Sequence, residues 1–356
     1  MGSSAVAVLG AGAIGSATAA VLASQGLKVR LYNRWFGDHE TSIAAAGLEA
    51  RGVVSGRFPM ELVSDSVADT VAGTSLVFVC VPAFARGYLA EQLSGVLSPD
   101  STVVFHPGYT GDSLELFKRT GDAETVELSA SVYGASLPAP GLVDVFVRKG
   151  AVDVATSPSD RAEEWAEIVG SLFTIRTRPS KNCLVVGLGN PNPTYHVPVC
   201  LAAMPAIELQ LEVRYNDLIT PSVLRLLESV DEERVSLLRA ISGGEVVEDF
   251  WTFLRNAYPV KSINHVEMLQ EAYGSYEHLP SDLGSRYVTE DIPFGLVPWE
   301  GIGQILGVAT PTMSALIDIA SAARDTDFRQ AGRNREALGL ADIGSAEQLI
   351  QVFERR

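Results

Sequence analysis

Two polar segments in the second half of the chain contain side chains suited to acid–base catalysis. His196 ends the segment Asn192-Pro193-Thr194-Tyr195-His196, at the entry to an apolar helical stretch. An imidazole at this place can give a proton to a carbonyl or an imine. The alternative is a purely structural role, which is the more frequent one for a lone histidine at a helix entry.

The second segment runs from Arg286 to Gly295 and combines a cation with two adjacent carboxylates, Glu290 and Asp291. A carboxylate from this segment can orient an imidazole and stabilise its protonated form, as the aspartate of a Ser-His-Asp triad does. The alternative is a charged loop that caps a helix. The residue types alone do not decide between the two.

A glycine-rich motif near the N-terminus indicates a dinucleotide site. The residues at positions 10–15 read GAGAIG, follow an apolar run and open a helical stretch. The first glycine permits a tight turn, the second lets the backbone approach a pyrophosphate, and the third lets the helix pack close to the strand. The helix N-terminus then faces the phosphates. The predicted contacts are Gly10, Gly12, Ala13, Ile14 and Gly15. The alternative is a glycine turn without a ligand.

The end of the second expected strand favours NADPH over NADH. Sites for NAD usually place a carboxylate there to bind the ribose 2′-hydroxyl. This chain has Asn33 and Arg34 instead, so an amide can bind the ribose and a guanidinium can pair with a 2′-phosphate. The alternative is a solvated Arg34 beside an NADH site.

Two loops that follow later strands are expected to complete the cofactor site. They are Val81-Pro82-Ala83 and Pro107-Gly108-Tyr109-Thr110-Gly111, because ligands of such folds bind beyond the carboxyl ends of the strands. His106 precedes the second loop and can also approach the cofactor. His39 lies in a charged stretch and is expected to be solvated.

The elements that must position these residues begin with an α/β domain. Apolar runs alternate with helical patterns in the first half of the chain, which predicts a doubly wound Rossmann domain with a mostly parallel sheet. The expected strands are Ala5–Leu9, Leu27–Tyr32, Ser75–Val81, Thr102–Phe105 and Val143–Val147, with a small hairpin inside Leu48–Leu62 and a first helix at Ser16–Ser24.

Helical patterns dominate beyond Pro179 and predict an all-α second domain. We therefore expect a dinucleotide-binding domain at residues 1–180 and a helical domain with substrate and catalytic residues at 181–356. The expected helices are Val199–Leu211, Ser222–Ser229, Asp231–Ile241, Val247–Ala257, Ile302–Gly307 and Met313–Arg324.

Composition excludes several classes of function. The chain is 47% hydrophobic and 20% charged, which is typical of a globular protein, and its net charge of −16 would repel a nucleic acid. Three cysteines without CxxC spacing argue against a disulfide framework or a metal site. Neither a signal-peptide pattern nor a membrane-spanning apolar run is present, so we expect a cytoplasmic protein.

With these motifs the sequence resembles the octopine/nopaline (opine) dehydrogenase family over nearly the whole chain. Glycerol-3-phosphate dehydrogenases and ketopantoate reductases share the N-terminal part, so the resemblance depends on the C-terminal half. Residues 192–196 are similar to the family's Asn-x-x-x-His segment, and residues 286–293 to its Arg-Tyr-x-x-Glu-Asp-x-Pro segment. Further similar segments are Thr310–Met313, Asp327-Phe328, Gly332-Arg333 and Leu338–Leu340.

The resemblance implies a catalytic dyad in which His196 is the proton donor and Asp291 its orienting partner. It implies that an amino acid's amine condenses with a 2-oxo acid to an imine, which NADPH reduces to an N-(carboxyalkyl) amino acid. Both substrates would lie in a cleft between the domains, and a homodimer is compatible with the sequence. The residues expected to contact substrate are Glu127, Tyr133, Asn192 and Arg286.

Departures from the family's pattern concern the substrate. Ser136 stands where the family commonly has an arginine, and Ala85-Arg86 stands where a histidine often follows the Val-Pro-Ala loop. Val197 separates His196 from Pro198, which in the family often follows the histidine directly. These differences indicate a substrate of different shape, and they leave the dyad in place.

Two other functions remain open on the sequence. An NADPH-dependent reductase of a free 2-oxo acid or ketone would consume NADPH without any amine. A non-catalytic NADP-binding sensor would bind the cofactor without turnover.

Overall fold

The computed structural model describes residues 5–121, 123–244, 246–274 and 279–354. By their contacts these residues form two compact units. The first unit comprises residues 5–108, Asp112–Val186 and 353–354. The second comprises Tyr109–Gly111 and Gly187–Val352. Tyr109–Gly111 thus groups with the second unit, although it directly follows Gly108 in the chain.

The first unit contains an eight-stranded sheet in which each pair of neighbours is parallel except β11 and β8. Its central strands are short apolar runs that are buried throughout, as expected for a parallel sheet covered on both faces. In spatial order the strands are β12 (Arg176–Pro179), β11 (Ala151–Ser157), β8 (Glu124–Leu128), β7 (Thr102–Phe105), β6 (Leu76–Val79), β1 (Val6–Leu9), β2 (Val29–Tyr32) and β5 (Leu62–Ser64).

Helices alternate with these strands along the chain. The helix α1 (Ala13–Ser24) is buried over most of its length because it packs against strands of two different sheets. The other helical elements of this unit are α2 (Asp38–Ala46), α3 (Val67–Val71), η1 (Ala83–Ala85), α4 (Arg86–Leu93), α5 (Asp112–Thr120), η2 (Ser159–Arg161), α6 (Ala162–Phe173) and the start of α7 (Cys183–Leu188).

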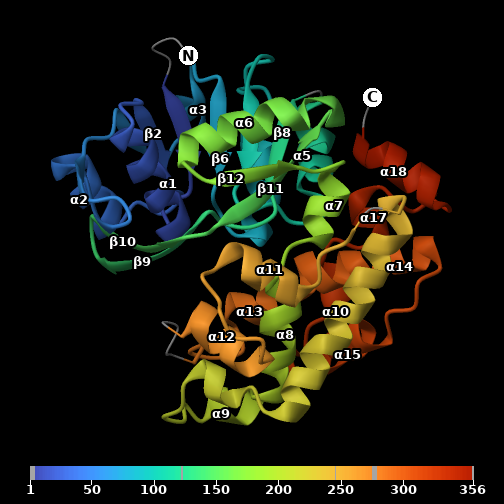
Figure 1. Cartoon of the computed structure of the whole chain (residues 1–356). Helices are drawn as coiled ribbons and strands as arrows, with labels where there is room; N and C mark the ends of the chain where they lie inside the picture. Colours follow the sequence, from blue (N-terminus) through green and yellow to red (C-terminus); the bar gives the residue numbers. More distant parts are fainter. Residues whose placement is uncertain (1–4, 122, 245, 275–278, 355–356) are drawn as a thin grey trace. The chain divides into compact units, whose positions relative to one another are not determined.

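A second, four-stranded sheet lies against α1, where Figure 1 shows β9 and β10 as two long strands. Its order is β4 (Gly56–Phe58), β3 (Leu48–Gly52), β10 (Leu142–Arg148) and β9 (Tyr133–Ala139). The expected hairpin is thus present as β3 and β4. The expected strand at Val143–Val147 is also present, but it pairs with β3 and β9 and does not join the main sheet.

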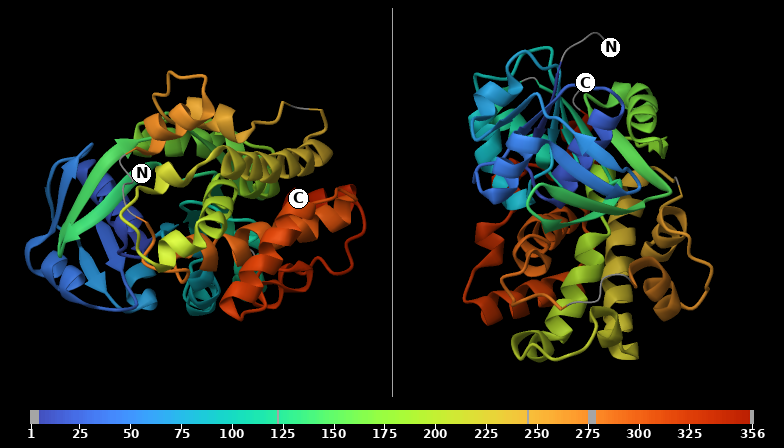
Figure 2. Two further views of the ribbon diagram at one scale, coloured as in Figure 1. Left: turned by 90° about the horizontal axis from the view of Figure 1, so that it is seen from below. Right: turned by 90° about the vertical axis from the view of Figure 1, so that its left-hand side faces the viewer.

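The second unit is helical in all of its described residues that have regular structure. Its longest helix, α10, packs beside α8 (Figure 2). The elements are the end of α7, α8 (Asn192–Ala202), α9 (Met204–Glu208), η3 (Tyr215–Leu218), α10 (Pro221–Ser242), α11 (Phe250–Ala257), α12 (His265–Tyr273), α13 (Arg286–Thr289), the π-helix η4 (Ile292–Leu296), α14 (Val297–Leu306), α15 (Pro311–Arg324), α16 (Phe328–Ala331), α17 (Arg335–Leu338) and all but the last two residues of α18 (Ala346–Glu354).

The helix α10 corrects one expectation, since the sequence predicted a break near Asp231. The expected helices there were Ser222–Ser229 and Asp231–Ile241, whereas one helix spans both. In the structure the carboxylate of Asp231 is buried inside one continuous helix, where it pairs with Arg234 and accepts a hydrogen bond from the Phe250 N–H. These partners replace the backbone groups that a capping aspartate would bind.

The predicted fold class, a Rossmann domain followed by an all-α domain, is confirmed. Of the helices in the described part of the chain, none has the length and apolar character needed to cross a membrane.

Candidate active site

The glycine turn joins β1 to α1 in the geometry that a bound pyrophosphate requires. Gly10 has φ +112°, a conformation that side chains disfavour, and a Cβ at Gly15 would lie 1.7 Å from the Gly10 carbonyl oxygen. Around Gly12, by contrast, a Cβ would meet no atom within 4 Å. Gly12 caps α1 without any side-chain hydrogen bond, and no acidic residue occupies the first turn.

Ala13 and Ile14 supply backbone N–H groups at the start of α1, both residues are half-buried, and the first turn of the helix has no carboxylate that would repel an anion. This arrangement fits a dinucleotide phosphate, which helix N-termini bind through such groups.

Asn33 and Arg34 follow β2, as the sequence predicted, but they are held differently. The Asn33 side-chain amide donates to Oε1 of Glu40 at 2.6 Å and to the carbonyl of Trp35 at 3.0 Å. The exposed guanidinium of Arg34 lies 4.1 Å from the centroid of the Tyr88 ring and 5.2 Å from that of Trp35. Among the described residues no carboxylate forms an ion pair with Arg34. Its charge is therefore available to an anion from solution.

The expectation that His39 is solvated is corrected by the structure, because its ring nitrogens contact other residues. Its Nδ1 accepts from the Gly141 N–H at 3.0 Å, and its Nε2 lies 3.1 Å from Oγ of Ser16. The ring thus joins α1 to the turn between β9 and β10. Burial lowers its pKa, although the charge of Glu40 opposes that effect.

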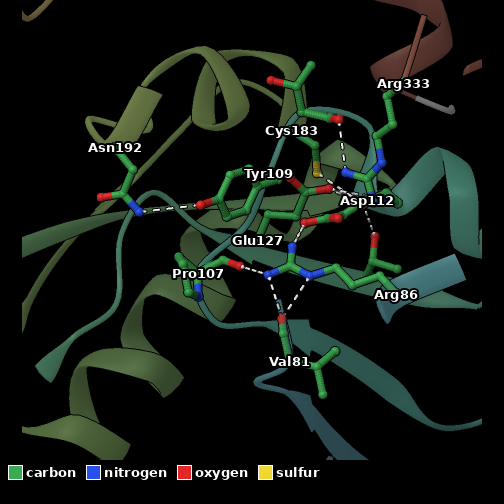
Figure 3. A network of polar contacts seen from close by, with 12 residues as sticks. Val81, Arg86, Pro107, Tyr109, Asp112, Glu127, Cys183, Asn192 and Arg333 are labelled. Carbon is green, nitrogen blue, oxygen red and sulfur yellow. Dashed lines mark hydrogen bonds and ion pairs between the residues drawn. The ribbon is translucent and has the colours of Figure 1, made fainter. Parts of the chain in front are cut away.

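The two later loops that were predicted to contact the cofactor are tied together by one buried cation, Arg86 (Figure 3). Its guanidinium donates to the carbonyls of Val81 at 3.3 Å and of Pro107 at 2.8 Å, and it forms a buried ion pair with Asp112. Pro82 and Gly108 lie in these same loops, which follow β6 and β7. The predicted residues at the ends of these two adjacent strands are therefore brought to one edge of the sheet.

His106 has both ring nitrogens occupied inside the first unit, so it has a structural role here. Its Nε2 accepts from the Val132 N–H at 2.7 Å, and its Nδ1 lies 3.2 Å from the Thr18 hydroxyl. Burial, assisted by the charges of Lys149 and Arg86, lowers the pKa of His106 to about 3. The ring is therefore neutral at physiological pH.

Glu127 and Tyr133 lie inside the first unit. Oε1 of Glu127 accepts from both the N–H and the hydroxyl of Ser113, and the Tyr133 hydroxyl donates to the carbonyl of Phe173 at 3.2 Å. Both side chains are almost fully buried. The geometry lends no support to a substrate contact by either residue, which stays a prediction.

In the second unit the structure brings His196 and Asp291 together, 95 positions apart in the chain. Nδ1 of His196 lies 2.7 Å from Oδ2 of Asp291. The helix α8 carries the histidine, and Asp291 stands immediately before the π-helix η4. The Asp291 side chain is buried, whereas 8% of His196 is accessible. Irregular helical turns of this kind recur at functional sites.

The carboxylate sets the tautomer of the histidine. An ionised aspartate can only accept, so Nδ1 of His196 carries the proton, and Nε2 has no hydrogen-bond partner among the described residues. Burial lowers the pKa of His196, although the Asp291 carboxylate acts in the opposite direction. The imidazole is thus neutral near pH 7 and presents a basic nitrogen at Nε2.

The other carboxylate oxygen of Asp291 is also bound. Oδ1 accepts from the Tyr109 hydroxyl at 3.0 Å. The Asn192 amide donates to the same hydroxyl at 3.4 Å (Figure 3). Asn192, which the sequence placed against substrate, is therefore part of the hydrogen-bond network of the dyad.

Arg286 and Tyr287 complete the surroundings of the dyad. The Tyr287 ring stacks on the His196 ring with 3.8 Å between centroids and 17° between planes. Arg286 is an exposed residue, its guanidinium lies 5.9 Å from the Tyr287 centroid, and it forms no ion pair with any described carboxylate. Desolvation of its charge is outweighed by the nearby charges of Glu290 and Asp291, which raise the pKa of Arg286. A cation beside the dyad is thus available to a substrate carboxylate. Within the described residues no group of three or more His, Cys, Asp or Glu side chains could hold a metal ion.

Sequence reasoning placed Tyr109 in a loop near the cofactor and missed its contact with Asp291; it also missed the roles of Tyr287 and Arg86. Tyr287 stands next to the predicted Arg286, so a closer reading of that segment could have included it. Arg86 was noted only as a departure from the family. Nothing in the sequence connects Tyr109 to Asp291, because 182 positions separate them.

Two protein-family models match this chain. Residues 179–324 match the model for the NAD/NADP octopine/nopaline dehydrogenase alpha-helical domain. Residues 6–158 match the model for ketopantoate reductase PanE/ApbA. The two matches fall on different halves of the sequence.

Similar proteins of known name include an opine dehydrogenase from Arthrobacter sp. (strain 1C), which is 31% identical over 354 residues and 96% of each chain. Vitopine synthase from Allorhizobium ampelinum is 26% identical over 80% of this chain and 79% of that protein.

Solved structures share the fold. Octopine dehydrogenase with NADH and L-arginine gives a TM-score of 0.80 at 16% identity, covering 99% of this chain and 98% of that one. Yersinopine dehydrogenase with NADP+ gives 0.74 at 18% identity, covering 100% and 99%.

Proposed function

Because this chain belongs to the octopine/nopaline (opine) dehydrogenase family, we propose that it is an NADPH-dependent enzyme that joins the amine of an amino acid or related amine to a 2-oxo acid. The observation that carries the proposal is the bond between His196 and Asp291. A neutral imidazole with an oriented, accessible nitrogen is what such a condensation needs. Protons must be removed from one substrate and given to the other.

His196 acts first as a base. An amino acid is an ammonium ion at neutral pH and cannot attack a carbonyl until it loses a proton. Nε2 of His196 accepts that proton, and Asp291 stabilises the resulting imidazolium. The amine lone pair then forms a C–N bond with the oxo-acid carbonyl carbon while the C=O π bond opens. The nitrogen then carries an extra proton and the oxygen a negative charge, and transfer of that proton from nitrogen to oxygen gives a neutral carbinolamine.

His196 then acts as an acid. The imidazolium returns its proton to the carbinolamine hydroxyl, which leaves as water while the C=N bond forms. NADPH, when bound, supplies the hydride that reduces the imine carbon. One ammonium, one 2-oxo acid, one NADPH and one proton thus give one secondary ammonium, one NADP+ and one water.

Arg286 is the residue proposed to bind a substrate carboxylate. Its guanidinium lies beside Tyr287, which stacks on His196, and it forms no ion pair with the described residues. A guanidinium can bind a carboxylate through two parallel hydrogen bonds, which fixes the orientation of the carbonyl as well as its position.

The glycine turn and Arg34 support the choice of cofactor. The open space around Gly12 suits a pyrophosphate. Near the end of β2, where an NAD site would have a carboxylate, Arg34 carries a positive charge that forms no ion pair with the described residues. Glu40, in the first turn of the following helix α2, is buried and bonded to Asn33 and to the Gly37 N–H. A 2′-phosphate therefore meets a cation there.

The proposal is tested by following NADPH and NADH oxidation across a panel of 2-oxo acids, each with and without a panel of amines. We expect turnover only when an oxo acid and an amine are both present. The product should have the mass of both substrates less one water plus two hydrogens. Turnover with an oxo acid alone would establish a simple reductase. NADPH binding without turnover on any pair would indicate a sensor.

A further inference from the structure

Tyr109 donates a hydrogen bond to the catalytic aspartate from a segment that lies far away in sequence. Its hydroxyl is 3.0 Å from Oδ1 of Asp291, while His196 occupies Oδ2. Tyr109, Asp291 and His196 are all buried or nearly so. Both oxygens of the carboxylate are therefore bound, each by a different ring.

The direction of this hydrogen bond follows from the partners. Burial, with the charges of Asp291 and Glu290, raises the pKa of Tyr109 well above its ordinary value, so the phenol stays protonated. The Asn192 amide donates to the phenol oxygen. Because the Asn192 amide binds a lone pair of the phenol oxygen, the phenol O–H is the group that donates to Asp291.

The backbone around Tyr109 is fixed by the second unit. The Trp299 Nε1–H donates to the Thr110 hydroxyl at 3.0 Å, and the Arg333 guanidinium donates to the Thr110 carbonyl at 3.1 Å. A Cβ at Gly187 would lie 2.7 Å from Cα of Thr110, so the segment is closely packed. Tyr109 is thus held against Asp291 by bonds that do not involve the dyad.

We propose that Tyr109 is a positioning residue of the dyad. It fixes the orientation of the Asp291 carboxylate and weakens the electrostatic attraction between that carboxylate and a proton on His196. The proposal rests on the proposed function of His196 and Asp291. The hydroxyl directs the positive end of its dipole toward Asp291 and so weakens the field with which the carboxylate stabilises an imidazolium. This keeps the resting imidazole neutral and able to accept a proton from the substrate ammonium.

The test is the pKa of His196 in the Tyr109→Phe variant of the full chain, measured by NMR titration of the imidazole signals. His196→Asn assigns the signal. The charged or titratable groups that contact the imidazole or act on its charge are Asp291, Arg286, Tyr287 and Tyr195. Behind it, the Tyr215 hydroxyl donates to the His196 carbonyl and lies 3.5 Å from the Cys200 sulfur, and the substitution alters none of these groups. We expect the pKa of His196 to rise by about half a unit, because the carboxylate then attracts the proton more strongly.

Thr110→Val is the matched control. It removes the bond from Trp299 in the same buried segment, but it leaves the hydroxyl of Tyr109 in place. We expect this variant to unfold at lower temperature than the wild type while the pKa of His196 stays unchanged. Equal pKa values in the wild type and Tyr109→Phe, or equal shifts in both variants, would overturn the proposal.

Kinetics give a second readout once a substrate pair is known. In Tyr109→Phe we expect kcat to fall about tenfold, as expected for loss of a hydrogen bond to a charged group, with little change in the KM for NADPH. The acidic limb of the pH–rate profile should move to higher pH. A fall in kcat that is uniform across pH would indicate a structural role only. Because the NMR titration needs no turnover, it tests this proposal even if the enzyme has a different reaction.

Discussion

The ring of Tyr287 covers one face of the His196 imidazole, with 3.8 Å between the ring centroids and 17° between the ring planes. Stacking at this distance restricts rotation of the imidazole about its side-chain bonds. The histidine therefore keeps Nδ1 directed at Asp291 and Nε2 available. An aromatic face also attracts a cation, so the same contact favours the imidazolium that forms during proton transfer.

Replacing Tyr287 by leucine should lower kcat several-fold to about tenfold, because the stacking and cation–π contributions together amount to roughly 1 kcal/mol. Tyr287→Phe is the control, since it keeps the ring and removes only the hydroxyl. Steady-state kinetics with a productive substrate pair would measure both. Equal losses in the two variants would assign the effect to the hydroxyl and contradict a role for the ring.

The dyad itself predicts two distinct phenotypes. His196→Ala should lower turnover by about 10²–10⁴-fold, the range of general acid–base catalysis, while NADPH still binds. Asp291→Asn should also reduce turnover strongly. Because Asp291 raises the pKa of His196, its loss should move the acidic limb of kcat/KM to lower pH. An unmoved pH–rate profile in Asp291→Asn would count against electrostatic coupling of the pair.

The lowered pKa of His106 leads us to expect that the stability of the fold depends on pH. Its pKa is about 3 in the folded chain and close to 6.5 when unfolded, so between these values the unfolded state binds more protons. The free energy of unfolding should therefore fall as pH decreases below 6.5, with a contribution of about 1.4 kcal/mol per pH unit from this residue. Urea denaturation of His106→Gln, which removes the titrating group, should show a shallower dependence on pH. Identical slopes would mean that His106 is not buried as a neutral ring.

Arg34 predicts cofactor preference. Arg34→Ala should weaken NADPH binding by about tenfold or more, since a charge-assisted contact with the 2′-phosphate would be lost, and should leave NADH nearly unchanged. Arg57→Ala, at an exposed arginine that pairs with Glu49 on the second sheet, is the control for the loss of one surface charge. Fluorescence titration of both cofactors would measure the effect. Equal weakening of NADPH and NADH would exclude Arg34 as the residue that recognises the phosphate.

Arg86 predicts a link between stability and cofactor binding. Arg86→Met leaves the buried carboxylate of Asp112 without its cation, which typically costs about 3–5 kcal/mol of stability. The double variant Arg86→Met, Asp112→Asn should recover much of that loss. It should not recover cofactor affinity, because the carbonyls of Val81 and Pro107 would still lack their shared donor. Thermal unfolding and NADPH titration would separate the two effects.

The fold was predictable where the signal is local. Apolar runs bounded by glycine and polar turns identified the strands β1, β6 and β7, because burial on both faces requires a predominantly apolar sequence. The strand β2 was identified in the same way, although it includes the half-buried Arg30. The run at Val143–Val147 looks the same in sequence. Its membership of the second sheet depends on pairing with Leu48–Gly52, far along the chain, which no local pattern contains.

The candidate site divides in the same way. The turn at Gly10–Gly15 is a local motif with a mechanical reason for each glycine, and it was predictable from spacing. His196 and Asp291 were nominated as residue types, but only the family resemblance joined them. The contact of Tyr109 with Asp291 could not be predicted from the sequence, because a tyrosine after a Pro-Gly turn has no property that marks it as a donor to a carboxylate 182 positions away.

The grouping of Tyr109–Gly111 with the helical unit limits how this protein can be recombined with its relatives. Consider a chimera in which residues 1–186 are replaced by another dinucleotide-binding domain. The exchange would end at the boundary between the two units in the sequence, but it would remove Tyr109–Gly111, whose contacts are with the helical unit that is kept. The helical module would then lack the donor to Asp291 and the partner of Trp299. Domain exchange in this protein therefore requires that Tyr109, Thr110 and Gly111 be retained at the equivalent position of the introduced domain.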